Sequence, residues 1–161
     1  MAYMNVNWEI NEYGTGFPNN TLASEYGEHL LNVQLSTDTD NGMLVAADVD
    51  NAWVSFDVFA ETAVTTFKGI IEQQMGDGSW LVLVTDPGDA LFVYQKPLTP
   101  YESPRELLKE SAFYNKAGDI VRCYKLAKFD RISVSESNFN GTPVAGAKIT
   151  GVSDKKMTIG A

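Results

Sequence analysis

The sequence predicts a mainly β protein, a β-sandwich or barrel-like fold of antiparallel strands with one short α-helix near residues 104–113. Short apolar or alternating runs recur along the chain, and turn residues such as Gly, Pro, Asn and Asp separate them. The first hundred residues contain no long run with helical spacing. A clear helix start occurs at Ser103-Pro104-Arg105-Glu106, where serine caps, proline takes the first helical position and Glu106 completes a capping box.

Five or six strands are expected in the first hundred residues. Asn41-Gly42 lies between the apolar segments 30–36 and 43–49 and predicts a two-residue hairpin, because a type I′ turn needs positive φ at both central residues. Residues 53–59 alternate between two faces, as a strand does. The other strands expected in this part are 65–74, 80–85 and 90–95.

The segment 97–104 carries three prolines and is expected to break any regular element. The charge balance changes at the same place, since the first hundred residues carry a net −12 and the remainder a net +3, for a total of −9. We therefore expect a single β-rich unit, 1–161, with a possible internal boundary at 97–104. It would separate an acidic part, 1–96, from a part formed by 104–161.

Residues 118–136 are predicted to form a β-hairpin that carries a cluster of basic side chains. A strand at 119–126 precedes a turn at 127–130, and a strand returns at 131–135. Alternation places Ile120, Arg122, Tyr124 and Leu126 on one face, and Val121, Cys123 and Lys125 on the other. Two further strands are expected in the tail, at 144–152 and 157–160.

The composition argues against several kinds of site. The single cysteine, Cys123, leaves no internal disulfide and no thiolate metal cluster, and its place in a strand indicates an inert, packed residue. His29 is the only histidine, and no catalytic motif surrounds it. Neither Gly14-Thr15-Gly16 nor Met75-Gly76-Asp77-Gly78 precedes a helix, so neither is expected to bind phosphate. We expect no catalytic residue and no cofactor, and assign no metal ligand.

The net charge and the N-terminus bear on partners and location. A duplex-binding domain is normally basic, because phosphate contacts supply much of its affinity, so nucleic acid is not expected as a partner. The N-terminus has no basic region followed by an apolar one, and no stretch approaches the roughly 20 apolar residues of a membrane span. We expect synthesis in the cytoplasm and no membrane partner.

Acidic side chains leave two alternatives open. The carboxylates that flank Asn41-Gly42 could hold Ca²⁺, although the spacing of an EF-hand fails; they are Asp38, Asp40, Asp48 and Asp50. Two carboxylates in a cleft would suffice for glycoside hydrolysis, and Glu9 with Glu12 or Asp48 with Asp50 is such a pair. Every acidic protein has pairs of this kind, so solvated turn acids are the simpler interpretation.

The C-terminal segment carries a family resemblance. It contains FYNKAGDIVRCYKLAKFDRISVS, then FNGTPVAGAKITGV, then DKKMTIG, between Phe113 and Ala161. This segment resembles a family of capsid decoration or head-fibre proteins of tailed bacteriophages. The shared pattern is aromatic-Asn-x-x-Gly-Asp, a strand with Arg and Tyr, a Lys-Gly-Asp-like turn, Phe-x-Gly and Pro-Val-x-Gly. The chain departs from it at Phe129, which stands where the turn has glycine and leaves that turn's geometry open.

The resemblance implies a virion structural protein without catalysis, located on the capsid surface after synthesis in the host cytoplasm. It would bind the shell of major capsid protein and copies of itself, with a trimer favoured by the family analogy. The basic hairpin would then be a contact surface formed by Arg122, Tyr124, Lys125, Lys128, Phe129, Arg131 and Phe139. Basic side chains that merely solvate one face of a hairpin are the alternative.

A second class of function is a carbohydrate- or receptor-binding module. The chain has eighteen aromatic residues, and Trp8, Trp53 and Trp80 are among those that could form a sugar-stacking platform. In a β-rich domain of this size most aromatic residues are needed for the core. Whether these tryptophans or the tyrosines form an exposed patch distinguishes the two classes.

Overall fold

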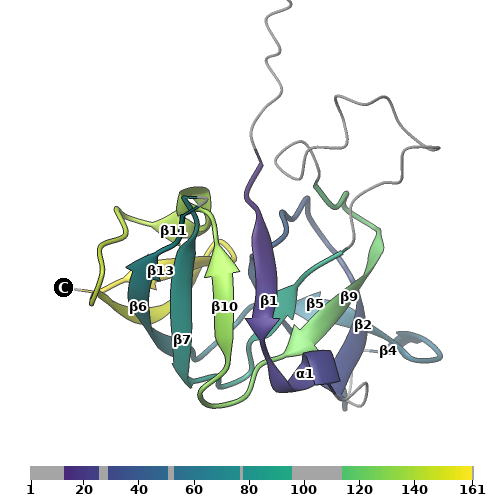
Figure 1. Ribbon diagram of the computed structural model, residues 1–161. Coiled ribbons are helices and arrows are strands. Elements are labelled where there is room, and N and C mark those ends of the chain that lie inside the picture. Colours follow the sequence, from purple (N-terminus) through teal and green to yellow (C-terminus); the bar gives the residue numbers. More distant parts are fainter. Residues whose placement is uncertain (1–12, 26–28, 51–52, 77, 96–113, 161) are drawn as a thin grey trace, which may run out of the picture.

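The computed structural model describes residues 13–25, 29–50, 53–76, 78–95 and 114–160. Within these ranges the chain is mainly β, as predicted from the sequence, and its strands form two sheets (Figure 1). One sheet closes into a barrel and the other is an open seven-stranded sheet.

The barrel has five strands, and each neighbouring pair is hydrogen-bonded. Its order is β2 (Leu30–Gln34), β9 (Ile120–Lys125), β8 (Leu91–Val93), β3 (Leu44–Ala47) and β5 (Val58–Thr62). A parallel pairing of β5 with β2, which sets Phe59 against Val33, closes the ring. The short strand β4 (Trp53–Ser55) pairs with β5 and extends this sheet beyond the ring.

The seven-stranded sheet is antiparallel except at one edge. Its order is β1 (Gly16–Asn20), β10 (Arg131–Val134), β7 (Trp80–Asp86), β6 (Lys68–Gln74), β12 (Lys148–Ser153), β13 (Lys156–Ile159) and β11 (Phe139–Asn140). The pair β11 and β13 is parallel. Short helical segments accompany the strands in the described residues, among them α1 (Leu22–Glu25) and the 3₁₀ turn η4 (Glu136–Asn138).

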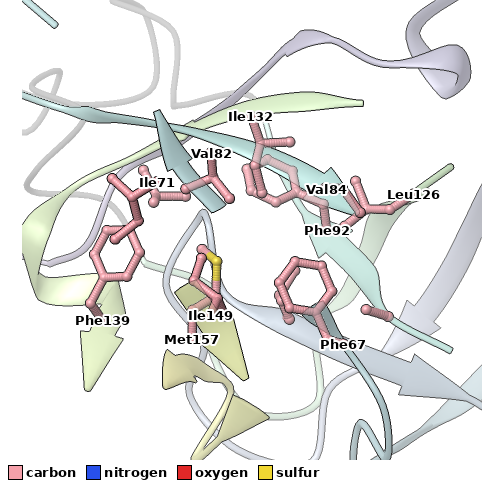
Figure 2. Packing of buried hydrophobic residues seen from close by; sticks show 13 residues of the cluster. Phe67, Ile71, Val82, Val84, Phe92, Leu126, Ile132, Phe139, Ile149 and Met157 are labelled. Atoms are coloured by element: carbon pink, nitrogen blue, oxygen red, sulfur yellow. The ribbon is translucent and has the colours of Figure 1, made fainter. Parts of the chain in front are cut away.

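The apolar side chains form two clusters. The smaller fills the barrel and consists of Val33, Leu35, Val45, Leu91, Val93, Val121 and Cys123. The larger joins the outer face of the barrel to the seven-stranded sheet, and Figure 2 shows Leu126 and Phe139 at opposite ends of it. Strand β8 connects the two clusters, because Leu91 and Val93 face the interior of the barrel while Phe92 packs in the larger cluster. All three residues of β8 are therefore buried.

The structure corrects the hairpin predicted at 118–136. Strands β9 and β10 lie where the sequence predicts strands, but β9 pairs with β2 and β8, and β10 pairs with β1 and β7. The chain between them crosses from the barrel to the other sheet. Buried Asp130 holds the crossover in place, since its carboxylate accepts bonds from the backbone N–H of Ala127 (2.7 Å) and of Leu22 (3.3 Å). The composition of a short turn does not reveal whether the strands on its two sides pair with each other, so the sequence could not exclude a hairpin.

The hairpin predicted at Asn41-Gly42 is also wrong, and its type I′ turn is not formed, because Gly42 has positive φ but Asn41 does not. Gly42 has φ +90°, as expected, but β2 and β3 are not hydrogen-bonded neighbours. Asn41 instead bonds Gln95 twice, donating from Nδ2 to the carbonyl (2.9 Å) and accepting at Oδ1 from the N–H (3.1 Å). Gly42 N–H donates to the carbonyl of Val93. The turn therefore directs the chain toward β8.

Residues 53–59 form a hairpin and not one strand. Asp57 adopts a left-handed backbone with φ +61°, and Ser55 pairs with Val58 across the turn. Aspartate is one of the residues that tolerates this conformation. Alternation of polar and apolar residues continues through the turn, so the hydrophobic pattern does not reveal it.

The two sheets are interleaved along the chain. The pairings β8 with β9, β7 with β10 and β6 with β12 each join a strand before residue 97 to one after residue 113. The boundary expected at 97–104 and the helix expected at 104–113 lie outside the described residues. No helix in the described residues is both long and apolar enough to cross a membrane.

Candidate functional site

The outer face of β9 and β2 carries an open groove of about 530 Å³. Its lining residues are Asn32, Tyr94, Gln95, Ile120, Arg122 and Tyr124. The alternation predicted for β9 is correct, because Val121 and Cys123 point into the barrel while Ile120 and Arg122 are exposed. The register of β2 against β9 sets Asn32 opposite Arg122.

Aromatic side chains form one wall of this groove. The rings of Tyr94 and Tyr124 meet edge to face with centroids 6.1 Å apart. Tyr94 also contacts Phe17 of β1, at 5.7 Å between centroids. Both tyrosines pack on the larger apolar cluster, so their positions are fixed by the core. The groove therefore offers preorganised apolar surface beside amide groups and the guanidinium of Arg122.

The structure separates the seven contact residues predicted from the sequence. Arg122 and Tyr124 share the groove, and Lys125 lies exposed at the end of β9. Arg131 belongs to the other sheet and pairs with Glu72 at 3.2 Å. Phe139 must be corrected, because it is only 6% exposed and belongs to the larger apolar cluster.

Lys128 and Phe129 lie in the crossover between the sheets. Both are exposed, Phe129 to 64%, and the Lys128 ammonium lies 5.2 Å from the centre of the Phe129 ring. Phe129 has φ +73°, a conformation that bulky residues seldom adopt. The geometry that the sequence leaves open at this turn is thus the left-handed one that favours glycine.

Four positions in the pattern of the C-terminal segment have left-handed backbone. They are Gly118, Phe129, Gly141 and Gly146, with φ of +89°, +73°, +114° and +87°. Each corresponds to a glycine of the pattern described above. The pattern therefore describes how this segment turns, and only its β9 residues contribute to the groove.

Sequence reasoning missed Phe56, the most exposed large apolar residue in the described part of the chain, which lies at the tip of the β4–β5 hairpin with Trp53, a residue considered only for sugar stacking. Phe56 is 94% exposed and Trp53 56%. Val54 and Val49 are exposed beside them, and the hairpin extends away from the barrel (Figure 1). The sequence signal was present only as apolar residues in an alternating run, which is typical of a core strand.

Acidic residues flank this tip in the sequence. Asp48, Asp50 and Asp57 are near it in sequence, and the chain has no lysine or arginine before Lys68. Asp57 connects the tip to the groove, because its Oδ2 accepts a bond from Asn32 Nδ2 at 3.4 Å. The apolar tip and the groove thus adjoin on the same side of the barrel.

A second polar cluster consists of Lys155, Glu61, Thr37, Thr39 and Ser36. The Lys155 ammonium donates to Glu61 Oε1 (2.6 Å), Thr39 Oγ1 (2.6 Å) and Thr37 Oγ1 (2.7 Å), which accounts for its three protons. The other oxygen of Glu61 accepts from the N–H and hydroxyl of Ser36 at 2.7 and 2.9 Å. These groups beside a cavity of about 300 Å³ are engaged with one another, so the cluster ties the β12–β13 turn to the barrel.

Buried amides link the two sheets nearby. Asn138 Nδ2 donates to the carbonyls of Thr15 (2.9 Å) and Asn41 (3.1 Å), and Asn115 Nδ2 donates to Asn41 Oδ1 (3.1 Å). A side chain at Gly42 would overlap Asn138 Nδ2, so the approach requires glycine. Burial raises the pKa of Asp40 at this junction. The hydrogen bond that its carboxylate accepts from Gly14 N–H lowers the pKa, but the effect of burial is larger. These contacts serve the fold.

The remaining candidates do not assemble into a site. Cys123 is inside the barrel, and burial, followed by the charge of Glu61, raises the pKa of its thiol to about 12. His29 lies just before β2, as the sequence predicts. Asp38 and Asp40 accept backbone bonds from Ala117 and Gly14 respectively. Among the described residues, no three His, Cys, Asp or Glu side chains form a group that could hold a metal ion.

The tryptophans considered for sugar stacking do not come together in the described residues either. Trp80 is partly buried against the larger cluster, and its Nε1 has no partner in the described part of the chain. Trp8, with Glu9 and Glu12, lies outside the described residues.

No protein-family model, curated protein or solved structure matches this chain.

Proposed function

We propose that this chain is a structural protein of a tailed-bacteriophage head, a decoration or head-fibre protein that binds the capsid shell and copies of itself without catalysis. It is made in the host cytoplasm and resides on the virion surface. Nucleic acid, membranes, cofactors and metals have no part in this function. The resemblance of residues 113–161 to that family motivates the proposal.

The observation that carries the proposal is the contrast between the exposed apolar tip and the engaged polar clusters. Apolar side chains as exposed as Phe56 and Trp53 are typical of a surface that docks on another protein. The polar groups that resemble a reactive cluster, such as Lys155 and Glu61, are occupied by contacts within the chain. An interaction surface on a rigid β scaffold is therefore the best supported role.

The test is location in the source organism's phage particles. Antibodies raised against the purified chain are applied to lysate fractions separated on a density gradient, and gold-labelled particles are imaged. We expect the chain to sediment with heads, and labels to decorate the shell. Recovery of the chain only as free protein, with no label on heads, would overturn the proposal.

The second candidate, a carbohydrate-binding module, has one specific observation in its favour. The groove places two tyrosines beside Asn32, Gln95 and Arg122, and such groups stack on sugar rings and bond their hydroxyls. A glycan array probed with the wild type and with Tyr124→Ala separates the candidates. Retention of a glycan by the wild type and its loss in the variant would favour this role.

A further inference from the structure

We propose that two copies of the chain pair reciprocally, each inserting its β4–β5 tip into the groove on β9 and β2 of the other. The tip is formed by Val49, Trp53, Val54 and Phe56. This inference rests on the self-association part of the proposed function and identifies both halves of the contact. The first half, the tip, is absent from the contact surface predicted from the sequence.

The tip needs a cover that the described part of its own chain does not supply. Phe56 is at the turn of a two-strand extension, and its ring remains 94% exposed. Trp53 is anchored by its own contacts, because Nε1 donates to the carbonyl of Val49 at 2.7 Å and its ring meets Phe59 at 4.7 Å. Trp53 is thus held in place, and Phe56 projects beyond it into solvent. Aromatic anchors of this kind supply much of the binding energy at protein interfaces.

The groove has the shape and chemistry to receive it. Its volume of about 530 Å³ lies in the range of pockets that take whole small molecules, and a phenyl ring is smaller than these. Exposed Ile120 and the ring of Tyr124 provide apolar surface against which Phe56 can pack. The amides of Asn32 and Gln95 supply the polar rim.

Charge complementarity identifies the occupant as a second copy. The tip carries Asp48, Asp50 and Asp57, whereas the groove presents Arg122 with Lys125 close by on β9. In the part of the chain that the structure describes, no carboxylate lies within ion-pair distance of Arg122. An acidic apolar projection and a basic apolar groove on one chain are complementary in charge, and opposite charges steer their encounter.

The adjacency of the two features sets the symmetry. The bond from Asn32 to Asp57 joins the groove to the hairpin turn, so both features occupy one face. When a projection and its matching groove lie side by side, a two-fold axis between them brings each projection to the opposite groove. Such a contact is isologous and closes as a dimer. The trimer suggested by the resemblance would need the two features on different faces.

Sedimentation equilibrium measures the pairing. We expect a dimer for the wild type, and a dissociation constant raised at least roughly 30-fold by Phe56→Ser, as for loss of an interface anchor. Arg122→Glu should weaken pairing as well, from the groove side. Val144→Ser is the matched control, because Val144 is 59% exposed but lies in the loop before β12. Equal effects of Phe56→Ser and Val144→Ser would overturn the pairing.

A disulfide experiment tests the geometry independently of affinity. Phe56→Cys and Ile120→Cys copies are prepared separately and mixed under mild oxidation, while buried Cys123 stays unreactive. We expect the mixed disulfide to form and each variant alone to give little cross-link. Self-cross-linking of Phe56→Cys, or a wild type that is a monomer or trimer, would overturn the reciprocal pair. A monomer that still binds phage heads would overturn the pairing and leave the shell-binding part of the proposed function standing.

Discussion

Two regions of the molecule differ in how they distribute polar and apolar side chains between interior and surface. One is the junction of the two sheets, and the other is the outer face of the barrel. At the junction polar groups are buried, among them Asn138 and the 5% exposed side chain of Glu61. On the outer face large apolar groups such as Phe56 and Trp53 are exposed. A buried polar group costs free energy unless it is hydrogen-bonded, and an exposed apolar group costs free energy unless another surface covers it.

The difference is in where those partners are. Glu61 is matched by Lys155 and Ser36, and the amide of Asn138 donates two bonds to backbone carbonyls. These bonds are all made within the chain, although Asn138 Oδ1 is buried without a hydrogen-bond partner in the described residues. Phe56 is covered by nothing in the described residues, which is why it indicates a second molecule.

The largest effect is expected from Lys155→Met, which breaks the junction. Glu61 would remain buried without its cation, and such a loss costs about 3–5 kcal/mol of unfolding free energy. Urea unfolding followed by circular dichroism measures it. Lys148→Met is the control, because Lys148 is exposed on β12 and should change stability by no more than about 0.5 kcal/mol. Similar losses in the two variants would refute a structural role for the cluster.

A smaller effect, dependent on pH, is expected from Cys123 in the barrel interior. The pKa of its thiol is raised from 9.0 to about 12, mainly by burial. Below pH 9 the thiol is protonated in both states and has no effect. Between pH 9 and 12 the unfolded chain loses the proton first, so the wild type should lose about 1.4 kcal/mol per pH unit relative to Cys123→Ala.

Unfolding free energies of both proteins at pH 8, 9, 10 and 10.5 supply this comparison. The other groups that titrate in this range are common to the two proteins and cancel in the difference. Parallel pH profiles for the wild type and the variant would show that the thiol is not held protonated by the barrel.

The smallest effect is expected from Phe129→Gly, and it should stabilise the fold. Phe129 has φ +73°, and releasing a bulky residue from the left-handed region is worth about 1 kcal/mol. Phe129→Ala separates this from loss of the ring, since alanine retains the backbone penalty. Thermal and urea unfolding should rank glycine above both phenylalanine and alanine. If alanine and glycine were equally stable, the backbone would not be the source of strain.

Strand positions could be predicted from the sequence because they depend on local patterns. Alternation in β9 correctly assigned Val121 and Cys123 to the inside and Arg122 to the outside. The turn between the two strands expected in the tail also lies where their bounds leave it, between paired Ser153 and Lys156. Pairing could not be predicted in the same way, since β9 finds its neighbours 30 residues and more away in sequence, in β8 and β2.

The candidate site was only partly predictable for a related reason. Arg122 and Tyr124 were identified from charge and aromatic character, and the structure places both in the groove. Phe139 and Phe56 have the same side chain, but one is buried and the other exposed. Local sequence does not distinguish them, because exposure depends on which strands cover each position. The engagement of Lys155 with Thr37 and Thr39 is likewise a long-range result.

The interleaving of the two sheets has a consequence for how the chain acquires its structure during synthesis. The barrel cannot close until β9 leaves the ribosome, because β9 lies between β2 and β8. The seven-stranded sheet likewise waits for β10, β12 and β13. Folding should therefore be largely post-translational and slow, on the order of milliseconds to seconds, as is usual when distant segments must meet. Until then, strand edges stay open, and nascent copies crowded on one message are at risk of misassembly.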